Sequence, residues 1–146
     1  MSLKKMLSIT KIFNFEMAHA INGYDGACKH IHGHSYQLFV SVSFAKNDSE
    51  YIAPPGFIID FKLLKQIVGK VVVSVLDHKL VLSKEFLANK PYVEVLENLI
   101  VWDFEPTVEN ILLFIKVAVS SELPRELRLT GLKLYETKDS YSEWKP

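Results

Sequence analysis

The chain has 146 residues, and its 17 Lys and Arg balance its 17 Asp and Glu, so the formal net charge is zero when histidine is neutral. That length predicts a single domain spanning residues 1–146. Neutral charge argues against nucleic acid as a partner, and the single Cys excludes an internal disulfide framework. There is no apolar run long enough for a membrane span and no signal-peptide core near Lys4, Lys5 and Lys11, so we expect a cytoplasmic protein with no membrane partner.

The first half of the chain predicts three strands. From Ile9 to His19 apolar and polar residues alternate, which is typical of a half-buried strand with His19 on its apolar face. A second alternating run, residues 32–44, begins its apolar face with His32 and His34. Residues 57–60 are expected to form a short strand that pairs back as a hairpin.

Two helices follow. Asp60 is a candidate N-cap for a helix whose apolar residues continue at helical spacing to Leu76. The segment 82–105 is the least regular, with a possible strand over residues 99–104. Thr107 caps a second helix that ends at Pro124.

The last alternating run, Arg128 to Thr137, predicts another strand, with Glu136 on the same face as its apolar residues. Together these elements indicate an α+β fold with an antiparallel sheet and both helices on one face.

Three histidines carry the most informative chemistry. Residues two apart in a strand project from the same side, so His32 and His34 can offer two imidazoles to one ion. His19 adds a third from the end of another strand. Three histidines with one open position are the ligand set of a catalytic zinc, so the pattern favours a Zn²⁺ site. The alternative is that they are polar surface histidines without a metal.

Four other residues are candidates for chemistry. Cys28 lies in a Gly-rich turn beside Lys29, where it can be a fourth metal ligand, an inert core residue or a reactive thiolate. Asp77 and His78 at the end of the first helix suit proton transfer, or His78 binds the last helix carbonyls. Glu136 needs adjacent N–H donors, such as one edge of a guanidine-like heterocycle, unless it lies at a solvated strand end.

A set of short motifs occurs in a fixed order between Phe13 and Thr137. They are Ala18-His19, Cys-x-x-x-His-Gly-His-Ser-Tyr at 28–36, Ile59-Asp60-Phe61, Leu76-Asp77-His78-Lys79, Pro106-Thr107-Val108-Glu109-Asn110 and Glu136-Thr137. The set resembles the 6-pyruvoyltetrahydropterin synthase family. The three residues between Cys28 and His32 are similar to the bacterial branch that forms 6-carboxytetrahydropterin.

The resemblance implies a tunnelling fold, or T-fold. In this fold a four-stranded antiparallel sheet with two long helices on one face assembles with other copies, usually as a hexamer of two stacked trimers with active sites between subunits. The resemblance also implies a role for each candidate: Zn²⁺ held by His19, His32 and His34, proton transfer by Cys28, Asp77 and His78, and pterin binding by Glu136 with Thr107 and Glu109.

The implied reaction is that of a carbon–carbon lyase. It converts 7,8-dihydroneopterin triphosphate to 6-carboxy-5,6,7,8-tetrahydropterin with release of acetaldehyde and triphosphate, as in queuosine biosynthesis. Formation of 6-pyruvoyltetrahydropterin is an alternative, disfavoured because Val108 replaces a second hydroxyl of the pyruvoyl-forming enzymes. A noncatalytic zinc- or pterin-binding module, in which Cys28 closes the metal site, is another. The sequence does not indicate which basic residues meet the triphosphate.

Overall fold

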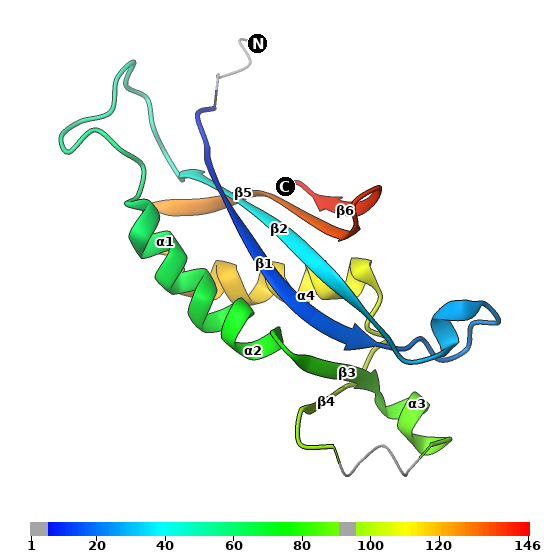
Figure 1. Ribbon diagram of the computed structural model, residues 1–146. Coiled ribbons are helices and arrows are strands. Elements are labelled where there is room, and N and C mark those ends of the chain that lie inside the picture. Colours follow the sequence, from blue (N-terminus) through cyan, green and yellow to red (C-terminus); the bar gives the residue numbers. More distant parts are fainter. Residues whose placement is uncertain (1–5, 91–95) are drawn as a thin grey trace.

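The computed structural model describes residues 6–90 and 96–146, which form one mixed sheet of six strands with the long helices on one face (Figure 1). The strands lie in the order β4-β3-β1-β2-β5-β6. Their bounds are β1 Ile9–His19, β2 His32–Phe44, β3 Lys79–Ser83, β4 Leu99–Trp102, β5 Leu127–Thr137 and β6 Ser140–Trp144. The β1–β3 and β3–β4 pairs are parallel, and the other neighbours are antiparallel.

This sheet corrects the expectation of four antiparallel strands. A parallel pair, β3 and β4, extends one edge, and β6 extends the other. The alternation rule could not find β3, because Leu80, Val81 and Leu82 are all buried, as is usual for a parallel strand covered on both faces. The polar composition of Ser140–Trp144 gave equally little sign of β6.

Two local expectations also need revision. The strand expected at residues 57–60 is absent, because the backbone bends there and Asp60 starts a helix instead. The segment treated as irregular, 82–105, contains the short helix α3, Lys84–Ala88, and β4, which lies within the strand expected over 99–104. Residues 91–95 of this segment lie outside the described residues.

Both expected long helices form where their caps predicted. The side chain of Asp60 accepts a hydrogen bond from the Lys62 N–H at 2.8 Å, and α1, Phe61–Val68, begins there. It continues through a π-helical turn, Gly69–Val73, into α2, Ser74–Leu76. The hydroxyl of Thr107 accepts from the Asn110 N–H at 3.2 Å and starts α4, Val108–Glu122.

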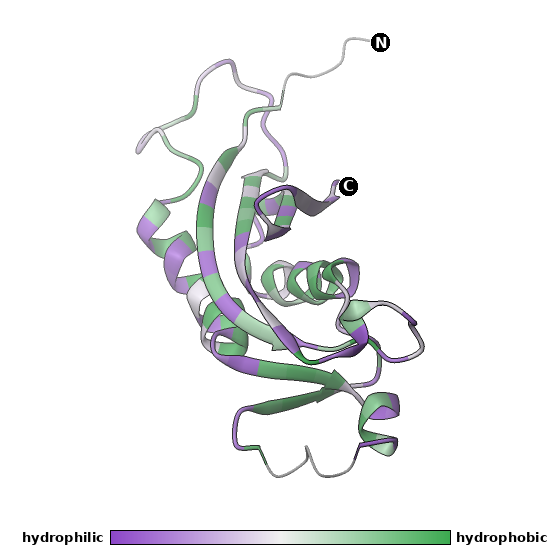
Figure 2. Ribbon diagram, turned by 45° about the vertical axis from the view of Figure 1, so that its right-hand side comes forward, coloured by the Kyte–Doolittle hydropathy of each residue, from purple (hydrophilic) through white to green (hydrophobic). Residues whose placement is uncertain are grey.

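The core lies between the helices and one face of the sheet. Along β1 and β2 hydrophobic and hydrophilic residues alternate (Figure 2). The buried residues that share this core include Phe13, Phe15 and Met17 of β1, Tyr36, Leu38 and Val40 of β2, Leu64, Val68, Val72 and Leu76 of the first helical segment and Ile111 and Ile115 of α4. No helix in the described part of the chain is long and apolar enough to cross a bilayer.

Candidate metal centre and active site

The pairing of β1 with β2 brings the three candidate histidines together at one end of the sheet. His19 lies directly opposite His32, and His34 follows two residues later on the same face. One ring nitrogen from each histidine lies within 4.8 Å of the others. His19 is buried, whereas His32 and His34 are partly exposed. The cluster is therefore anchored in the core and open on one side.

Backbone carbonyls orient two of these rings. His19 Nδ1 lies 2.6 Å from the Pro106 carbonyl oxygen, and His32 Nδ1 lies 2.7 Å from that of His30. Because a carbonyl oxygen only accepts, each Nδ1 carries the hydrogen and donates it. Burial lowers the pKa of His19 to about 4, so its ring is neutral at pH 7 and its Nε2 is a bare acceptor.

The free nitrogens then face one another. Nε2 of His19 and Nε2 of His32 are only 3.1 Å apart. Two ring nitrogens lie this close only when a proton or a metal ion between them offsets the repulsion of their lone pairs. Metal-bound histidines commonly donate their other ring N–H to a backbone carbonyl in this way.

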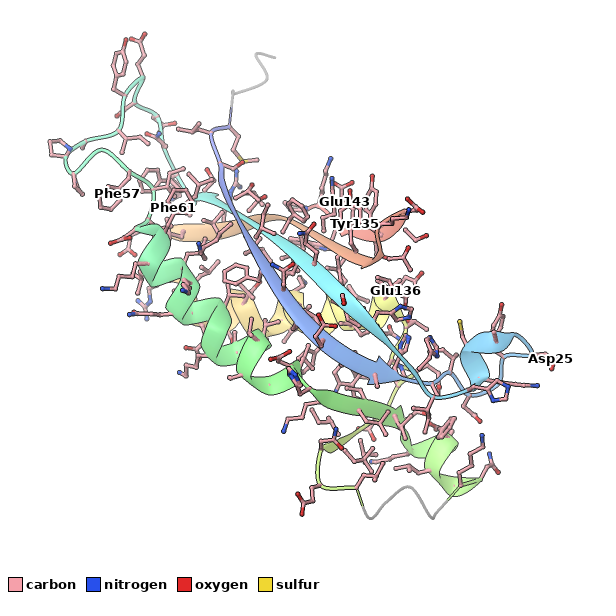
Figure 3. All side chains as sticks on the ribbon, viewed as in Figure 1. Asp25, Phe57, Phe61, Tyr135, Glu136 and Glu143 are labelled. Carbon is pink, nitrogen blue, oxygen red and sulfur yellow. The ribbon has the colours of Figure 1, made fainter. Side chains whose placement is uncertain are left out.

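His34 and Glu136 support the same interpretation. The Nε2 of His34 is buried and has no hydrogen-bond partner among the described residues. Burial lowers the pKa of His34, although the Glu136 carboxylate opposes this shift. Glu136, near the end of β5 (Figure 3), places Oε1 3.3 Å from His19 Nε2 and 3.5 Å from His34 Nε2. A carboxylate beside three imidazole nitrogens is a donor set that fits a divalent metal such as Zn²⁺.

A cavity of about 360 Å³ opens beside this cluster. Five of the nine residues singled out from the sequence line it: His19, Cys28, Thr107, Glu109 and Glu136. Thr107 and Glu109 reach it because α4 begins at its wall, and Cys28 reaches it from the loop between β1 and β2. A ligand in this cavity can therefore touch a histidine of the candidate metal cluster, a thiol and two carboxylates at once.

Cys28 is a free, exposed thiol in the 3₁₀ turn Ala27–Lys29. Its exposure excludes the inert core role. The cluster of close metal-ligating atoms found among the described residues contains the three histidines and not Cys28. The thiol therefore lies beside the candidate metal ligands but is not one of them. This favours a reactive role over a role as the fourth metal ligand.

Asp77 and His78 lie elsewhere. They follow α2, and His78 lines a separate pocket of about 350 Å³ together with Glu16, Ser35 and His34. The Asp77 carboxylate accepts from the Glu16 N–H at 2.9 Å, the main reason that its pKa is lowered, and it lies 3.0 Å from His78 Nδ1. The His78 ring, 79% exposed, pairs with Asp77 rather than with the last helix carbonyls. Within one chain this pair does not face the cavity of Cys28.

Three groups near the site escaped the sequence analysis. The Pro106 carbonyl orients His19 across 87 residues, and the Glu105 carboxylate accepts from the Asn22 N–H at 2.7 Å and fixes the loop that carries Cys28. Neither contact leaves a pattern in the sequence. Tyr36 is buried with its hydroxyl unpartnered among the described residues, and burial raises its pKa. Its position two residues after His34 on the same strand face was the available signal.

The α+β subunit with three converging histidines at the end of its sheet has the architecture of the T-fold pterin enzymes. The chain belongs to the 6-pyruvoyl tetrahydropterin synthase family, whose model matches residues 8–146.

Similar proteins support the same family. The chain is 32% identical to 6-carboxy-5,6,7,8-tetrahydropterin synthase of Haemophilus influenzae, over 95% of this chain and 99% of that protein. It is 30% identical to the protein of the same name from Rickettsia typhi, over 94% and 99%.

Two solved structures share the fold. One is an uncharacterized protein from Wolinella succinogenes, with a TM-score of 0.74 at 19% identity, covering 97% of this chain and 99% of that one. The other is the Caenorhabditis elegans 6-pyruvoyl tetrahydropterin synthase, with a TM-score of 0.69 at 18% identity, covering 97% and 96%.

Proposed function

We propose that this protein is a zinc-dependent, cytoplasmic 6-carboxy-5,6,7,8-tetrahydropterin synthase. It converts 7,8-dihydroneopterin triphosphate and one water molecule to 6-carboxy-5,6,7,8-tetrahydropterin, with release of acetaldehyde and triphosphate, and so supplies 7-deazapurine (queuosine) biosynthesis. The observation that carries the proposal is the single cavity in which Cys28, Glu136 and His19 of the three-histidine cluster meet. The full-length relatives of the same name support this choice of product.

Each residue of the cavity has a role in this reaction. Glu136 accepts hydrogen bonds from the amino group and ring N–H of the pterin and so fixes its orientation, while Thr107 and Glu109 line the same end. Cys28, as thiolate, removes a proton from the side chain of the substrate. His19, His32 and His34 hold Zn²⁺, which, when bound, supplies Lewis-acid polarisation of the side-chain hydroxyls.

Asp77 and His78 act at the active site of a neighbouring copy in this proposal. His78, held by the Asp77 carboxylate at 3.0 Å, is the partner acid or base for Cys28. Because His78 and Cys28 line separate pockets of one chain, a second subunit is the means by which the two groups come together. The outer edges of β4 and β6 are free among the described residues, so sheets of adjacent copies can join there, as in a hexamer of two trimers.

The decisive experiment is to incubate the zinc-loaded protein with 7,8-dihydroneopterin triphosphate, identify the pterin by mass and assay acetaldehyde. We expect acetaldehyde and the carboxy product in equal amounts. A pyruvoyl product, or no turnover by fully loaded protein, would contradict the proposal.

The variant Cys28→Ala separates the enzyme from a binding module. If Cys28 is catalytic, the variant keeps one zinc per chain and loses turnover by several orders of magnitude. Loss of zinc in this variant would instead show that Cys28 closes the metal site.

A further inference from the structure

A second, smaller pocket adjoins the candidate active-site cavity. It has a volume of about 240 Å³ and lies between the loop that carries Cys28 and the short helix α3. Ile21 and Tyr24 line both hollows, so these two side chains form the wall between them. A ligand bound beside Cys28 needs to pass only this wall to enter the second pocket.

The two hollows differ in charge. The second pocket is lined by Lys29 and Lys90 together with the amides of Asn22 and Asn89, and no carboxylate lines it among the described residues. We call it the basic pocket. The adjoining cavity carries Glu109 and Glu136 instead. Ammonium and amide groups donate hydrogen bonds, so the basic pocket suits an anion, whereas the carboxylates of the cavity suit a group rich in N–H donors.

Both lysines of the basic pocket are available to a ligand. Lys29 lies 3.6 Å from the Asp25 carboxylate, but Asp25 is fully exposed at the tip of its loop (Figure 3), and an exposed ion pair of this kind is weak. The Lys90 ammonium lies 4.7 Å from the ring centroid of Phe86, a buried residue of α3, and it has no carboxylate partner among the described residues. An incoming polyanion therefore displaces at most one weak contact.

The loop between the hollows is held by its own hydrogen bonds. The Ile21 N–H donates to the Cys28 carbonyl at 2.8 Å, and the Asn22 N–H donates to Glu105 at 2.7 Å. Cys28 lines the cavity, and Lys29, the next residue, lines the basic pocket. The arrangement matches a ligand with an N–H-rich head, a reactive middle beside Cys28 and a polyanionic tail.

We infer that the basic pocket binds the triphosphate tail of the pterin substrate, with Lys29 and Lys90 as its cationic ligands. This inference rests on the proposed function, because it takes the substrate to be a pterin with a polyphosphate ester. It assigns a binding role to residues for which the sequence gave none. Lys90 acts only through the tail, whereas Lys29 also neighbours the thiol, so Lys90 gives the cleaner test.

The test compares Lys90→Gln and the double variant Lys29→Gln/Lys90→Gln with a control, Lys62→Gln/Lys65→Gln, which removes two exposed positive charges from α1. Steady-state kinetics with 7,8-dihydroneopterin triphosphate give KM and kcat. Calorimetry gives the affinity for inorganic tripolyphosphate and for 7,8-dihydroneopterin, which lacks the tail.

For Lys90→Gln we expect KM to rise by about tenfold, with kcat changed less than about twofold, because the lost contact is far from the reacting atoms. Affinity for tripolyphosphate falls by a similar factor and becomes less sensitive to salt, while affinity for dihydroneopterin is unchanged. The double variant shows a larger loss, and the control behaves as wild type.

Unchanged tripolyphosphate affinity in the double variant overturns the inference, and so does an equal loss in the control. If the wild type turned over no substrate, the proposed function would fail, yet calorimetry with tripolyphosphate would still decide whether the basic pocket binds polyphosphate.

Discussion

At the scale of single residues, the most informative feature is the close approach of the Nε2 atoms of His19 and His32. The Pro106 and His30 carbonyl oxygens accept hydrogen bonds from the Nδ1–H groups of His19 and His32. The Nε2 atoms of the same two rings lie 3.1 Å apart. A proton or a metal ion between these two nitrogens offsets the repulsion of their lone pairs, so the fold favours a cation at this point.

Replacing one of these ligands tests the metal centre. In His32→Ala we expect zinc affinity to fall by at least about a hundredfold while the fold persists, because His32 is only partly buried. Metal content after dialysis, measured by elemental analysis, checks this. The control is His78→Asn, which removes an imidazole outside the cluster, and Asn tolerates the positive φ of 60° at this position. Stoichiometric zinc in His32→Ala would refute the metal assignment.

Asp77 makes a pH-dependent contribution to stability. Its pKa is lowered from 3.8, chiefly by the Glu16 N–H, so its stabilisation is complete above pH 3.8 and is lost as the pH falls through the lower, folded-state value. Asp77→Ala should therefore reduce the free energy of unfolding near neutral pH, by less than about 1 kcal/mol since the side chain is 36% exposed. The difference should shrink below pH 3.8.

Urea unfolding of wild type and variant between pH 7 and pH 3 measures this effect. The exposed residue Asp25 supplies the control, since Asp25→Ala removes a carboxylate without a backbone hydrogen bond in the described structure. A stability difference for Asp77→Ala that stays constant with pH would be inconsistent with the role of the ionised carboxylate.

At the scale of elements, helix starts followed from the sequence, whereas two strands did not. Asp60 and Thr107 cap their helices through side-chain oxygens and nearby N–H groups, a local interaction that any sequence reading can anticipate. In contrast, β3 is an uninterrupted apolar run and β6 a polar edge strand. Neither alternates, so partners distant in the chain decide that they are strands.

The cap of α4 supports both the helix and the cavity. Thr107→Ala removes the acceptor of the Asn110 N–H and should lower the free energy of unfolding by about 1 kcal/mol. Thr107→Ser keeps the hydroxyl and should retain most of this stability. Urea unfolding of the three proteins measures both values. Equal destabilisation by Ala and Ser would show that the methyl group, not the cap, is what matters.

At the scale of the whole molecule, the separation of Cys28 from Asp77 and His78 is the dominant feature. The two sets line different pockets of one chain. In the proposed reaction two copies of the chain form one site, one contributing Cys28 and the other Asp77 and His78. The free edges of β4 and β6 are where such copies can join in the described structure.

Mixing two inactive variants tests this shared site. Cys28→Ala and His78→Asn are each expected to be inactive alone. After denaturation and refolding together in equal amounts, we expect activity to return to at most about a quarter of wild type, the chance that one site receives both intact residues. The control is the same mixture left undenatured, which should stay inactive unless subunits exchange. No recovery after refolding would place both groups of a working site in one chain.

The sequence by itself determined the family and the positions of strands β1, β2 and β5, of both capped helices and of the candidate residues, because alternation, caps and short motifs are local signals. The tertiary structure alone decided which of those residues meet. It joined His19 to the Pro106 carbonyl across 87 residues and gathered Cys28 with Glu136 around one cavity. It also placed His78 in a separate pocket and added a parallel pair of strands to the sheet. These outcomes depend on pairing between segments that are distant in the chain, and local sequence patterns do not predict such pairing.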